Sequence, residues 1–330
     1  MAFLSDLYAA VARRRRERFV RRPDLRRRLR RPVVSVGNLA VGGRGKTPTV
    51  AAIARLLVEM GERPAVLSRG YARTRPEDGV VVVSAPDGIR ADLARAGDEP
   101  LMLARQLPGV SVLASPDRYL AGRLAEHHFG VTVHVLDDGF QHLPLDRDID
   151  IVIVSPEDLA AEARTLPLGR LRERPDALAA ADAVFAAGEG VVLPDGCDVP
   201  VFRLMRRLDA PVVQIPLDPA VPVLAVAGIA DPRRFLADLA HLGWRVAASA
   251  LFPDHHPYTA RDVDRIHSDA RAAGAGAVLT TEKDYVRLLP FRPFPLPVGY
   301  VPLTMELEPL PDFRRWLDAS LRAARDIIVD

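Results

Sequence analysis

The 330-residue sequence predicts an α/β fold built on a mainly parallel sheet. Two observations lead to this fold class. Short apolar strands alternate with helical patterns along the chain, and a glycine-rich loop separates the first strand from the helix that follows it. In such a fold ligands bind at the carboxyl ends of the strands, so the loops at those ends are the places to search for chemistry.

The expected elements follow one another in a regular order. An amphipathic helix is expected over 2–20, with apolar residues on one side at positions Phe3, Leu4, Leu7, Tyr8 and Val11. Strands are expected over 32–36, 63–68, 80–84, 131–136, 149–155, 223–227, 245–250 and 277–281. Helices are expected over 48–60, 98–107, 115–128, 232–242 and 259–273.

The pattern changes to short proline-rich segments around residues 190–222, which are typical of a linker or a hairpin between lobes. A second series of strands and helices then begins. We therefore expect a basic arm over 1–31 that is part of the first domain, a first α/β domain over 32–205, a linker over 206–222 and a smaller α/β lobe over 223–330.

Composition excludes several classes of protein. Hydrophobic residues make up 48% of the chain and charged residues 27%, as in a soluble globular protein. The single cysteine, Cys197, cannot form an internal disulfide. No apolar stretch is long enough to span a bilayer, and the N-terminal charges follow the apolar run instead of preceding it, which argues against a signal peptide. We expect a protein of the cytoplasm.

Positive charge is concentrated in the arm. Residues 1–31 contain twelve arginines and three acidic residues, a net charge of +9, while the whole chain carries only +2. A basic arm on an acidic body needs an anionic partner, and both nucleic acid and an anionic membrane surface are candidates. Alternatively, the helix over 2–20 packs on its own domain.

The strongest motif is a Walker A sequence between the first strand and the helix over 48–60. It consists of Ala40, Val41, Gly42, Gly43, Arg44, Gly45, Lys46 and Thr47. Its glycines allow backbone N–H groups to face phosphates, its lysine reaches the β- and γ-phosphates of ATP, and its threonine holds Mg²⁺. Only Lys46 and Lys283 are lysines among 45 basic residues, so each is a candidate for a role that needs a compact ammonium group.

Asp137 and Asp138 directly follow the apolar strand over 131–136. Carboxylates at such a strand end bind Mg²⁺ in the Walker B arrangement, although an acidic pair before a glycine is also an ordinary turn.

A kinase further needs a group that takes the proton of the acceptor hydroxyl, and Asp98 and His255 are candidates. Asp98 could instead cap a helix, and the His255–His256 pair could lie on the surface. No further spacing of cysteine or histidine supports a zinc site.

Seven strings together resemble the tetraacyldisaccharide 4′-kinase family. They are SVGNL leading into GGRGKTP (35–48), SRGY (68–71), GDEP (97–100), DDGFQH (137–142), LGRLRE (168–173), FPDHH (252–256) and TEKD (281–284). The resemblance extends from the N-terminal helix to about residue 290. It implies a P-loop NTPase-like domain and a second lobe, with ATP and substrate meeting in the cleft between them.

The resemblance also implies a reaction and a set of residues. The γ-phosphate of ATP would pass to the 4′-hydroxyl of tetraacyldisaccharide 1-phosphate, a lipid A precursor, to give lipid IVA. Asp98 would act as base with His255 behind it, Pro48 would complete the nucleotide site, and Asp138 would be the Mg²⁺ ligand, with Asp137 beside it. Substrate contacts would come from Arg69, Tyr71, Arg118, Gln141, His142, Arg172, Glu173 and Lys283.

A lipid substrate explains the arm, because the enzyme would work as a peripheral protein on the cytoplasmic face of the inner membrane, without a nucleic-acid partner. Ala40 stands where the family commonly has threonine, and Arg44 where it has a small polar residue. The alternatives are a P-loop ligase or kinase of the dethiobiotin-synthetase type, and a non-enzymatic nucleotide switch that binds nucleic acid through the arm.

Overall fold

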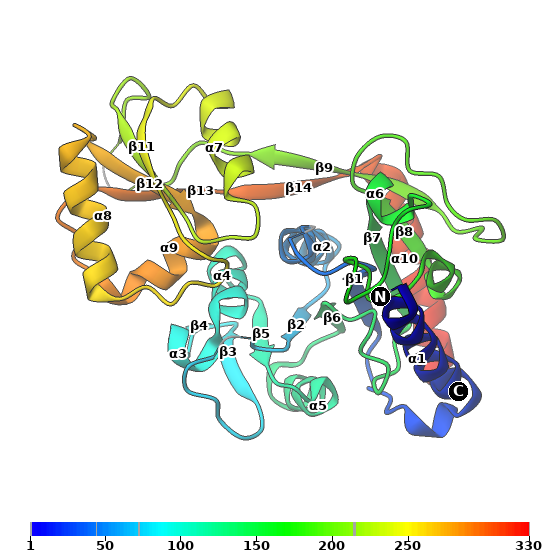
Figure 1. The fold of residues 1–330 in the computed structure, drawn as a ribbon. Coiled ribbons are helices and arrows are strands. Elements are labelled where there is room, and N and C mark those ends of the chain that lie inside the picture. Colours follow the sequence, from blue (N-terminus) through cyan, green and yellow to red (C-terminus); the bar gives the residue numbers. More distant parts are fainter. Residues whose placement is uncertain (1, 44, 72, 214–215, 330) are drawn as a thin grey trace.

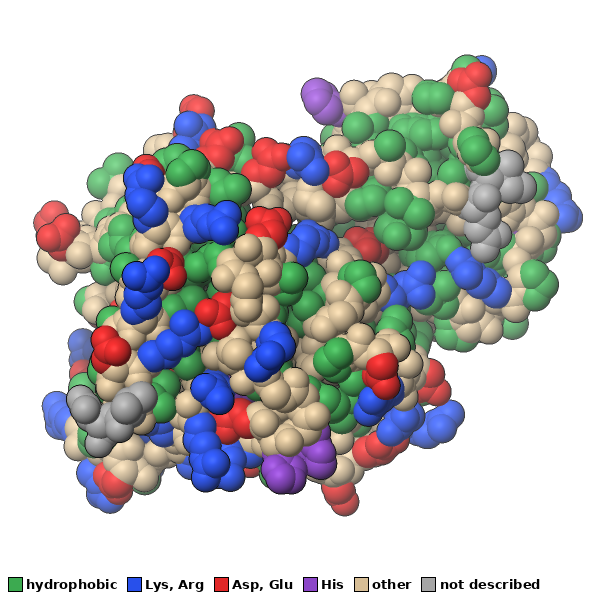
Figure 2. Space-filling model, turned by 180° about the vertical axis from the view of Figure 1, so that it is seen from behind, with side chains coloured by type: hydrophobic (Ala, Val, Ile, Leu, Met, Phe, Trp, Pro, Cys, Tyr) green, Lys and Arg blue, Asp and Glu red, His purple; other side chains and the backbone are tan. Residues whose placement is uncertain are grey.

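The protein consists of two lobes, each with its own sheet (Figure 1). The structure is a computed structural model that describes residues 2–43, 45–71, 73–213 and 216–329, with side chains for all of these except 2 and 329. Lys and Arg side chains gather mainly on the larger lobe in the view from behind (Figure 2). The N-terminal helix α1 (Ala2–Arg21) lies on that larger lobe.

The larger lobe contains a ten-stranded sheet in the order β14-β9-β8-β7-β1-β6-β2-β5-β3-β4. The strands from β9 to β5 in this order are parallel, and β14, β3 and β4 pair antiparallel at the edges. Their bounds are β1 Val33–Asn38, β2 Pro64–Ser68, β3 Val81–Ala85, β4 Gly88–Ile89, β5 Ser111–Ala114, β6 Val133–Asp137, β7 Ile149–Val154, β8 Ala183–Ala186, β9 Val201–Leu208 and β14 Leu303–Glu308.

The smaller lobe contains a parallel sheet in the order β11-β10-β12-β13. Its strands are β10 Val223–Ala227, β11 Val246–Leu251, β12 Ala277–Thr281 and β13 Val298–Val301. The other α-helices of the described residues are α2 Lys46–Glu59, α3 Leu93–Ala96, α4 Asp98–Gln106, α5 Arg118–Phe129, α6 Pro156–Leu159, α7 Pro232–His241, α8 Ala260–Ala272, α9 Glu282–Leu288 and α10 Leu310–Val329.

The central strands are buried on both faces, which is why they appear in the sequence as continuous apolar runs. In β1, Val34 and Val36 pack with α2 and α10 on one face, while Val33 packs with α5 on the other. This packing fixes the carboxyl end of β1, and with it the start of the glycine-rich loop.

Two predicted boundaries are wrong. The boundary expected at 205, before a linker or hairpin, falls inside strand β9, which pairs with β14, almost a hundred residues later. The smaller lobe does not extend to residue 330 either. After β13 the chain returns to the larger lobe, where Phe313 and Leu317 of α10 join its core. The antiparallel β9–β14 ribbon connects the two lobes (Figure 1).

A second connection between the lobes lies between α4 and α9 (Figure 1). Gln106 of α4 donates a hydrogen bond to Glu282 of α9 at 2.6 Å, and Lys283 of α9 donates one to Glu99 of α4 at 3.1 Å. The two lobes are therefore in polar contact beside the carboxyl ends of the larger sheet.

Candidate active site

The glycine-rich loop has the backbone that its sequence predicts. Gly42 and Gly45 have φ values of 103° and 78°, in the left-handed region that favours glycine. Gly45 directly precedes α2, so the loop ends at a helix N-terminus, where backbone N–H groups and the helix dipole favour an anion. Arg44 lies outside the described residues.

A second segment runs antiparallel to the start of this loop. Ala40 bridges to Leu171, the Val41 N–H donates to the Arg170 carbonyl at 2.7 Å, and the Arg172 N–H donates to the Leu39 carbonyl at 2.6 Å. This pairing places the Arg172 side chain at the end of β1. The register of the two segments is thus a structural requirement of the site, since a shift of one residue would turn Arg172 away.

Lys46 points toward the acidic pair. Its Nζ donates to Asn38 Oδ1 at 3.2 Å and lies 3.8 Å from Asp138 Oδ1. Burial lowers the pKa of Lys46, and the charge of Asp138 opposes that shift. The ammonium group thus contacts groups at the ends of β1 and β6.

The two aspartates have opposite electrostatic environments. Both Asp138 oxygens accept hydrogen bonds from Arg172, at 2.7 and 2.8 Å, and these outweigh the effect of burial, so the pKa of Asp138 is lowered. Burial, with the charges of Glu99 and Asp138, raises the pKa of Asp137 to about 7. Asp137 Oδ1 is buried and has no hydrogen-bond partner among the described residues. Asp137 is therefore the carboxylate with an oxygen available for a ligand.

Replacing Asp137 by asparagine is expected to stabilise the metal-free protein above pH 7. A carboxyl whose folded pKa is raised from 3.8 to about 7 costs stability as pH rises between those values, and the full cost is present above pH 7. Thermal unfolding in EDTA at pH 5 and pH 8 checks this, and Asp137→Asn should raise Tm more at pH 8.

The matched control is Asp138→Asn. Because Arg172 lowers the pKa of Asp138, its ionised form stabilises the fold at neutral pH, and that variant should unfold at a lower temperature than the wild type. Equal Tm changes of the same sign in both variants would contradict this assignment.

Asp98 and His255 meet across the two lobes. Asp98 begins α4, and His255 lies in the loop after β11, with a φ of 58°. Its Nδ1 is 3.0 Å from Asp98 Oδ2. An ionised carboxylate can only accept, so Nδ1 carries the proton and Nε2 is the acceptor, which receives a hydrogen bond from Lys283 Nζ at 3.0 Å.

Asp98 is ionised although it is only 3% exposed. Burial would by itself raise its pKa, but the hydrogen bond from His255 and the charges of Lys283 and Arg287 lower the pKa of Asp98 well below its ordinary value. Gly97, which precedes it, needs its φ of 84°, and a Cβ there would lie 2.5 Å from the Tyr71 carbonyl oxygen. Asp98 does not cap α4, because Gly97 is the N-cap residue.

The Asp98–His255 pair and the glycine-rich loop belong to one site. Glu99 connects them, because it accepts a hydrogen bond from Lys283 and its charge contributes to the shifted pKa values of Lys46 and Asp137. The structure thus brings Lys46, Asp137, Asp98 and His255 together, from opposite lobes.

The other predicted substrate residues surround this site at different depths. Arg118 is 6% exposed at the start of α5, where burial and Arg69 lower its pKa to about 10. Burial and Arg118 lower the pKa of His142 to about 4. Gln141 Nε2 donates to the Asn38 carbonyl at 3.1 Å. Tyr71 is 60% exposed and its ring packs edge-on against that of His255 at 5.2 Å.

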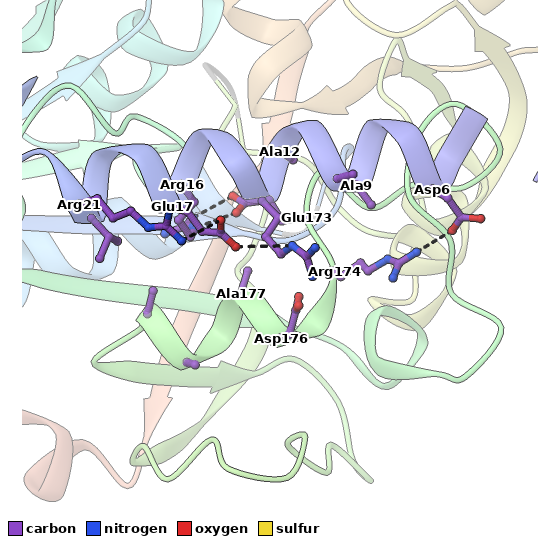
Figure 3. Close-up of a pocket in the computed structure, with 15 residues that line it drawn as sticks. Asp6, Ala9, Ala12, Arg16, Glu17, Arg21, Glu173, Arg174, Asp176 and Ala177 are labelled. Atoms are coloured by element: carbon purple, nitrogen blue, oxygen red, sulfur yellow. Dashed lines mark hydrogen bonds and ion pairs between the residues drawn. The ribbon is translucent and has the colours of Figure 1, made fainter. Parts of the chain in front are cut away.

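Glu173 has a different setting. Its carboxylate accepts two hydrogen bonds from Arg16 of α1, at 2.6 and 2.8 Å (Figure 3). The same guanidinium lies 4.1 Å from the centroid of the Phe140 ring. Arg174 pairs with Asp6 at 2.6 Å on the same side (Figure 3). Glu173 therefore holds the N-terminal helix against the larger lobe, close to the segment that follows Asp137 and Asp138.

A groove of about 410 Å³ lies between α1 and residues 173–180. Figure 3 shows the residues that line it. Alanines from both sides, such as Ala9, Ala12 and Ala177, give it an apolar floor, and arginines stand at its edges. None of the P-loop residues that the structure describes lines this groove, so it is separate from the site described above.

Sequence reasoning missed two residues of the site. Asn38 ends β1 and contacts both Lys46 and Arg172. Arg287 in α9 donates to Asp98. Asn38 had a signal, since it is a polar residue at the end of a buried strand. Nothing in the sequence indicated Arg287, because burial of one arginine cannot be recognised in an arginine-rich chain.

Comparison with known proteins identifies the family. A family model described as tetraacyldisaccharide-1-P 4′-kinase matches residues 1–322. The chain belongs to the tetraacyldisaccharide-1-phosphate 4′-kinase family. It is therefore a kinase of lipid A biosynthesis.

Relatives from several bacteria agree with this family. The chain is 42% identical over 275 residues to the tetraacyldisaccharide 4′-kinase of Geobacter metallireducens, with 80% of each chain covered. It is 38% identical over 335 residues to that of Geobacter sulfurreducens, covering 94% of this chain and 90% of the relative. The solved structure of LpxK from Aquifex aeolicus in complex with ATP superposes with a TM-score of 0.80 at 32% identity, covering 96% of this chain and 97% of that one.

Proposed function

We propose that this enzyme transfers the γ-phosphate of ATP to the 4′-hydroxyl of tetraacyldisaccharide 1-phosphate, a lipid A precursor, to give lipid IVA. The observation that carries the proposal is the pairing of Asp98 with His255 at 3.0 Å, in a chain whose glycine-rich loop has left-handed glycines at 42 and 45. Family membership supports this acceptor, and the geometry supports a phosphate site with a proton acceptor nearby.

ATP would be held by the loop over 40–48. The left-handed glycines Gly42 and Gly45 support inward-facing N–H groups, and Lys46 would exchange its contacts with Asn38 and Asp138 for the β- and γ-phosphates. Pro48 in the first turn of α2 removes no needed donor, since the N–H groups of that turn have no intrahelical partner.

Mg²⁺ would be held by Thr47 and Asp137, with Asp138 behind them. Hard cations prefer oxygen ligands, and the unpartnered Asp137 Oδ1 fits such an ion, whereas both Asp138 oxygens are already paired with Arg172. When bound, the ion would neutralise charge on the β- and γ-phosphate oxygens.

The proton of the 4′-hydroxyl would pass to the Asp98–His255 pair while its oxygen attacks the γ-phosphorus and ADP leaves. We assign Asp98 as the base, with His255 behind it to hold its orientation. Lys283 keeps His255 Nε2 occupied from the other side, so the imidazole ring has a fixed orientation.

Cationic and polar residues at the same edge would hold the acceptor and the transferred phosphoryl group. Arg118 is a buried cation close enough to Asp137 and Asp138 to interact with both. Arg69, Tyr71, Gln141, His142 and Lys283 would contact the sugar and its 1-phosphate. Because arginine presents a planar fork, Arg118 and Arg69 suit phosphate oxygens.

The experiment that tests this function is phosphate transfer from radiolabelled ATP to tetraacyldisaccharide 1-phosphate in mixed micelles. A 4′-deoxy acceptor is the matched control. The expected result is labelled lipid with the first acceptor and none with the second. Tight ATP binding without transfer to either acceptor would overturn the proposed acceptor and leave the nucleotide site standing.

We further propose that α1 attaches the enzyme to the anionic cytoplasmic surface of the inner membrane. Within the described residues, no helix is long and apolar enough to cross a bilayer. The inner side of α1 is fastened to the larger lobe through Ser5 and Arg16, while Phe3, Leu7 and Val11 on the other side are 50–73% exposed. An exposed apolar stripe followed by arginines suits an interfacial helix.

Replacing Phe3, Leu7 and Val11 together by serine is expected to weaken binding to phosphatidylglycerol-containing vesicles by about 100-fold. Each apolar side chain that is partly buried in the membrane contributes roughly 1 kcal/mol of binding free energy, which serine does not supply. Vesicle flotation measures this. The control triple, Val58, Ile89 and Val192 to serine, removes similarly exposed apolar side chains outside α1 and should bind as the wild type does. Equal binding of both triples would contradict the role of α1.

A further inference from the structure

We propose that Arg287 is a positioning residue of the kinase reaction, which holds the Asp98 carboxylate from the opposite lobe so that the base is set only when α9 lies against α4. The inference rests on the proposed function. It concerns a residue outside the motifs that carry the family resemblance.

Arg287 donates hydrogen bonds from two nitrogens to one oxygen of Asp98. Its Nε and Nη2 lie 2.9 and 2.6 Å from Asp98 Oδ2. The side chain of Arg287 is 6% exposed and that of Asp98 is 4% exposed, so water does not compete with this contact. A charge-assisted contact with a planar guanidinium fixes direction as well as distance.

The guanidinium is itself held rigidly by the smaller lobe. Its Nη1 donates to the Gly228 carbonyl at 2.8 Å and to Asp284 Oδ1 at 3.0 Å. Asp284 is fully buried and also accepts from the Gly228 N–H, Thr281 Oγ1 and Tyr258 OH. Asp284 therefore anchors the Arg287 guanidinium to the smaller lobe, and Arg287 cannot follow Asp98 if the lobes separate.

As a result of this contact, the two Asp98 oxygens accept different numbers of hydrogen bonds. Oδ2 accepts from His255 Nδ1 and from both Arg287 nitrogens, whereas among the described residues Oδ1 accepts only from the Glu99 N–H, at 2.9 Å. A carboxylate oxygen has two lone-pair positions, so Oδ1 keeps one position for the proton of the acceptor. Arg287 thus decides which oxygen is presented.

The charges around Asp98 come mainly from α9. Arg287 and Lys283 of that helix face it, His255 lies beside it, and Glu99 of its own helix pairs with Lys283. Because His255 belongs to the smaller lobe as α9 does, moving that lobe away would take Arg287, Lys283 and His255 from Asp98 together, and the ionised carboxylate would lose its charged partners. Asp98 is therefore held as an ionised, oriented base only when the two lobes are in contact.

The test compares Arg287→Lys and Arg287→Ala with the control Arg265→Met, an exposed arginine of α8. Lysine keeps the buried charge but loses the two-nitrogen grip. We expect kcat to fall about 10-fold in Arg287→Lys and about 100-fold in Arg287→Ala, with KM for ATP unchanged, because a misplaced base slows only the chemical step. Thermal unfolding of each variant checks that it is folded.

A second background separates positioning from a purely structural role. In Asp98→Asn the base is already lost, so adding Arg287→Lys should lower kcat no further. A wild-type kcat in Arg287→Lys, or a further 10-fold loss in the Asp98→Asn background, would overturn the inference. If Arg287→Ala does not fold, Arg287→Lys still decides. Failure of the wild type to phosphorylate the disaccharide would instead overturn the proposed function.

Discussion

Replacing Lys46 by methionine is expected to lower kcat by about 10²–10³-fold, the loss seen when one charge-stabilising donor is removed from a reacting centre. The γ-phosphoryl group carries its charge on oxygens that this ammonium would contact during transfer. Methionine has a similar length and no charge, so the substitution removes the donor with little change in packing.

The fold should survive this substitution. Burial lowers the pKa of Lys46, which means that the folded state holds this ammonium at a cost, and the Asn38 and Asp138 acceptors keep their contacts with Arg172. Steady-state kinetics and thermal unfolding are measured together. Arg322→Met, an exposed arginine of α10, is the control. A folded Lys46→Met enzyme with a kcat within tenfold of the wild type would contradict the role of Lys46.

Local patterns predicted the centre of the larger lobe. The strand ending at Asn38, the glycine-rich loop and α2 are contiguous, and their conformations depend on glycines and apolar runs that are visible in the sequence. The same holds for Asp137, which ends a buried strand. Each of these features needs only neighbouring residues to be recognised.

The return of the chain to the larger lobe could not be predicted in this way. β9 alternates buried and exposed residues, which indicates a strand with one covered face, but nothing in it names β14 as its partner. Pairing between distant strands depends on the folded arrangement of everything between them. The boundary expected at residue 330 was wrong for this reason.

The roles of charged residues divide in the same manner. Lys46 stands out because the chain has only two lysines, whereas Arg16 and Arg287 are hidden among 43 arginines. Their importance comes from burial, beside Glu173 in one case and Asp98 in the other. Burial of a charged side chain requires partners from elsewhere in the fold, so it appears only in three dimensions.

Replacing Asp98 by asparagine is expected to lower kcat by about 10²–10⁴-fold with little change in KM for ATP. Asparagine keeps the shape of the side chain but cannot take a proton. If its oxygen stays at the Oδ2 position, it still accepts from Arg287 and His255, and its NH₂ group faces the Glu99 N–H, so that one hydrogen bond is lost.

The companion variant His255→Gln decides which member of the pair takes the proton. If Asp98 is the base and His255 orients it, Asp98→Asn loses more activity than His255→Gln, and the double variant is no slower than Asp98→Asn alone. A larger loss in His255→Gln would instead assign the proton to Nε2, which already accepts a hydrogen bond from Lys283. Rates near the wild type in both variants would show that the pair takes no part in the reaction. In that case α9 could not act on the reaction through Asp98.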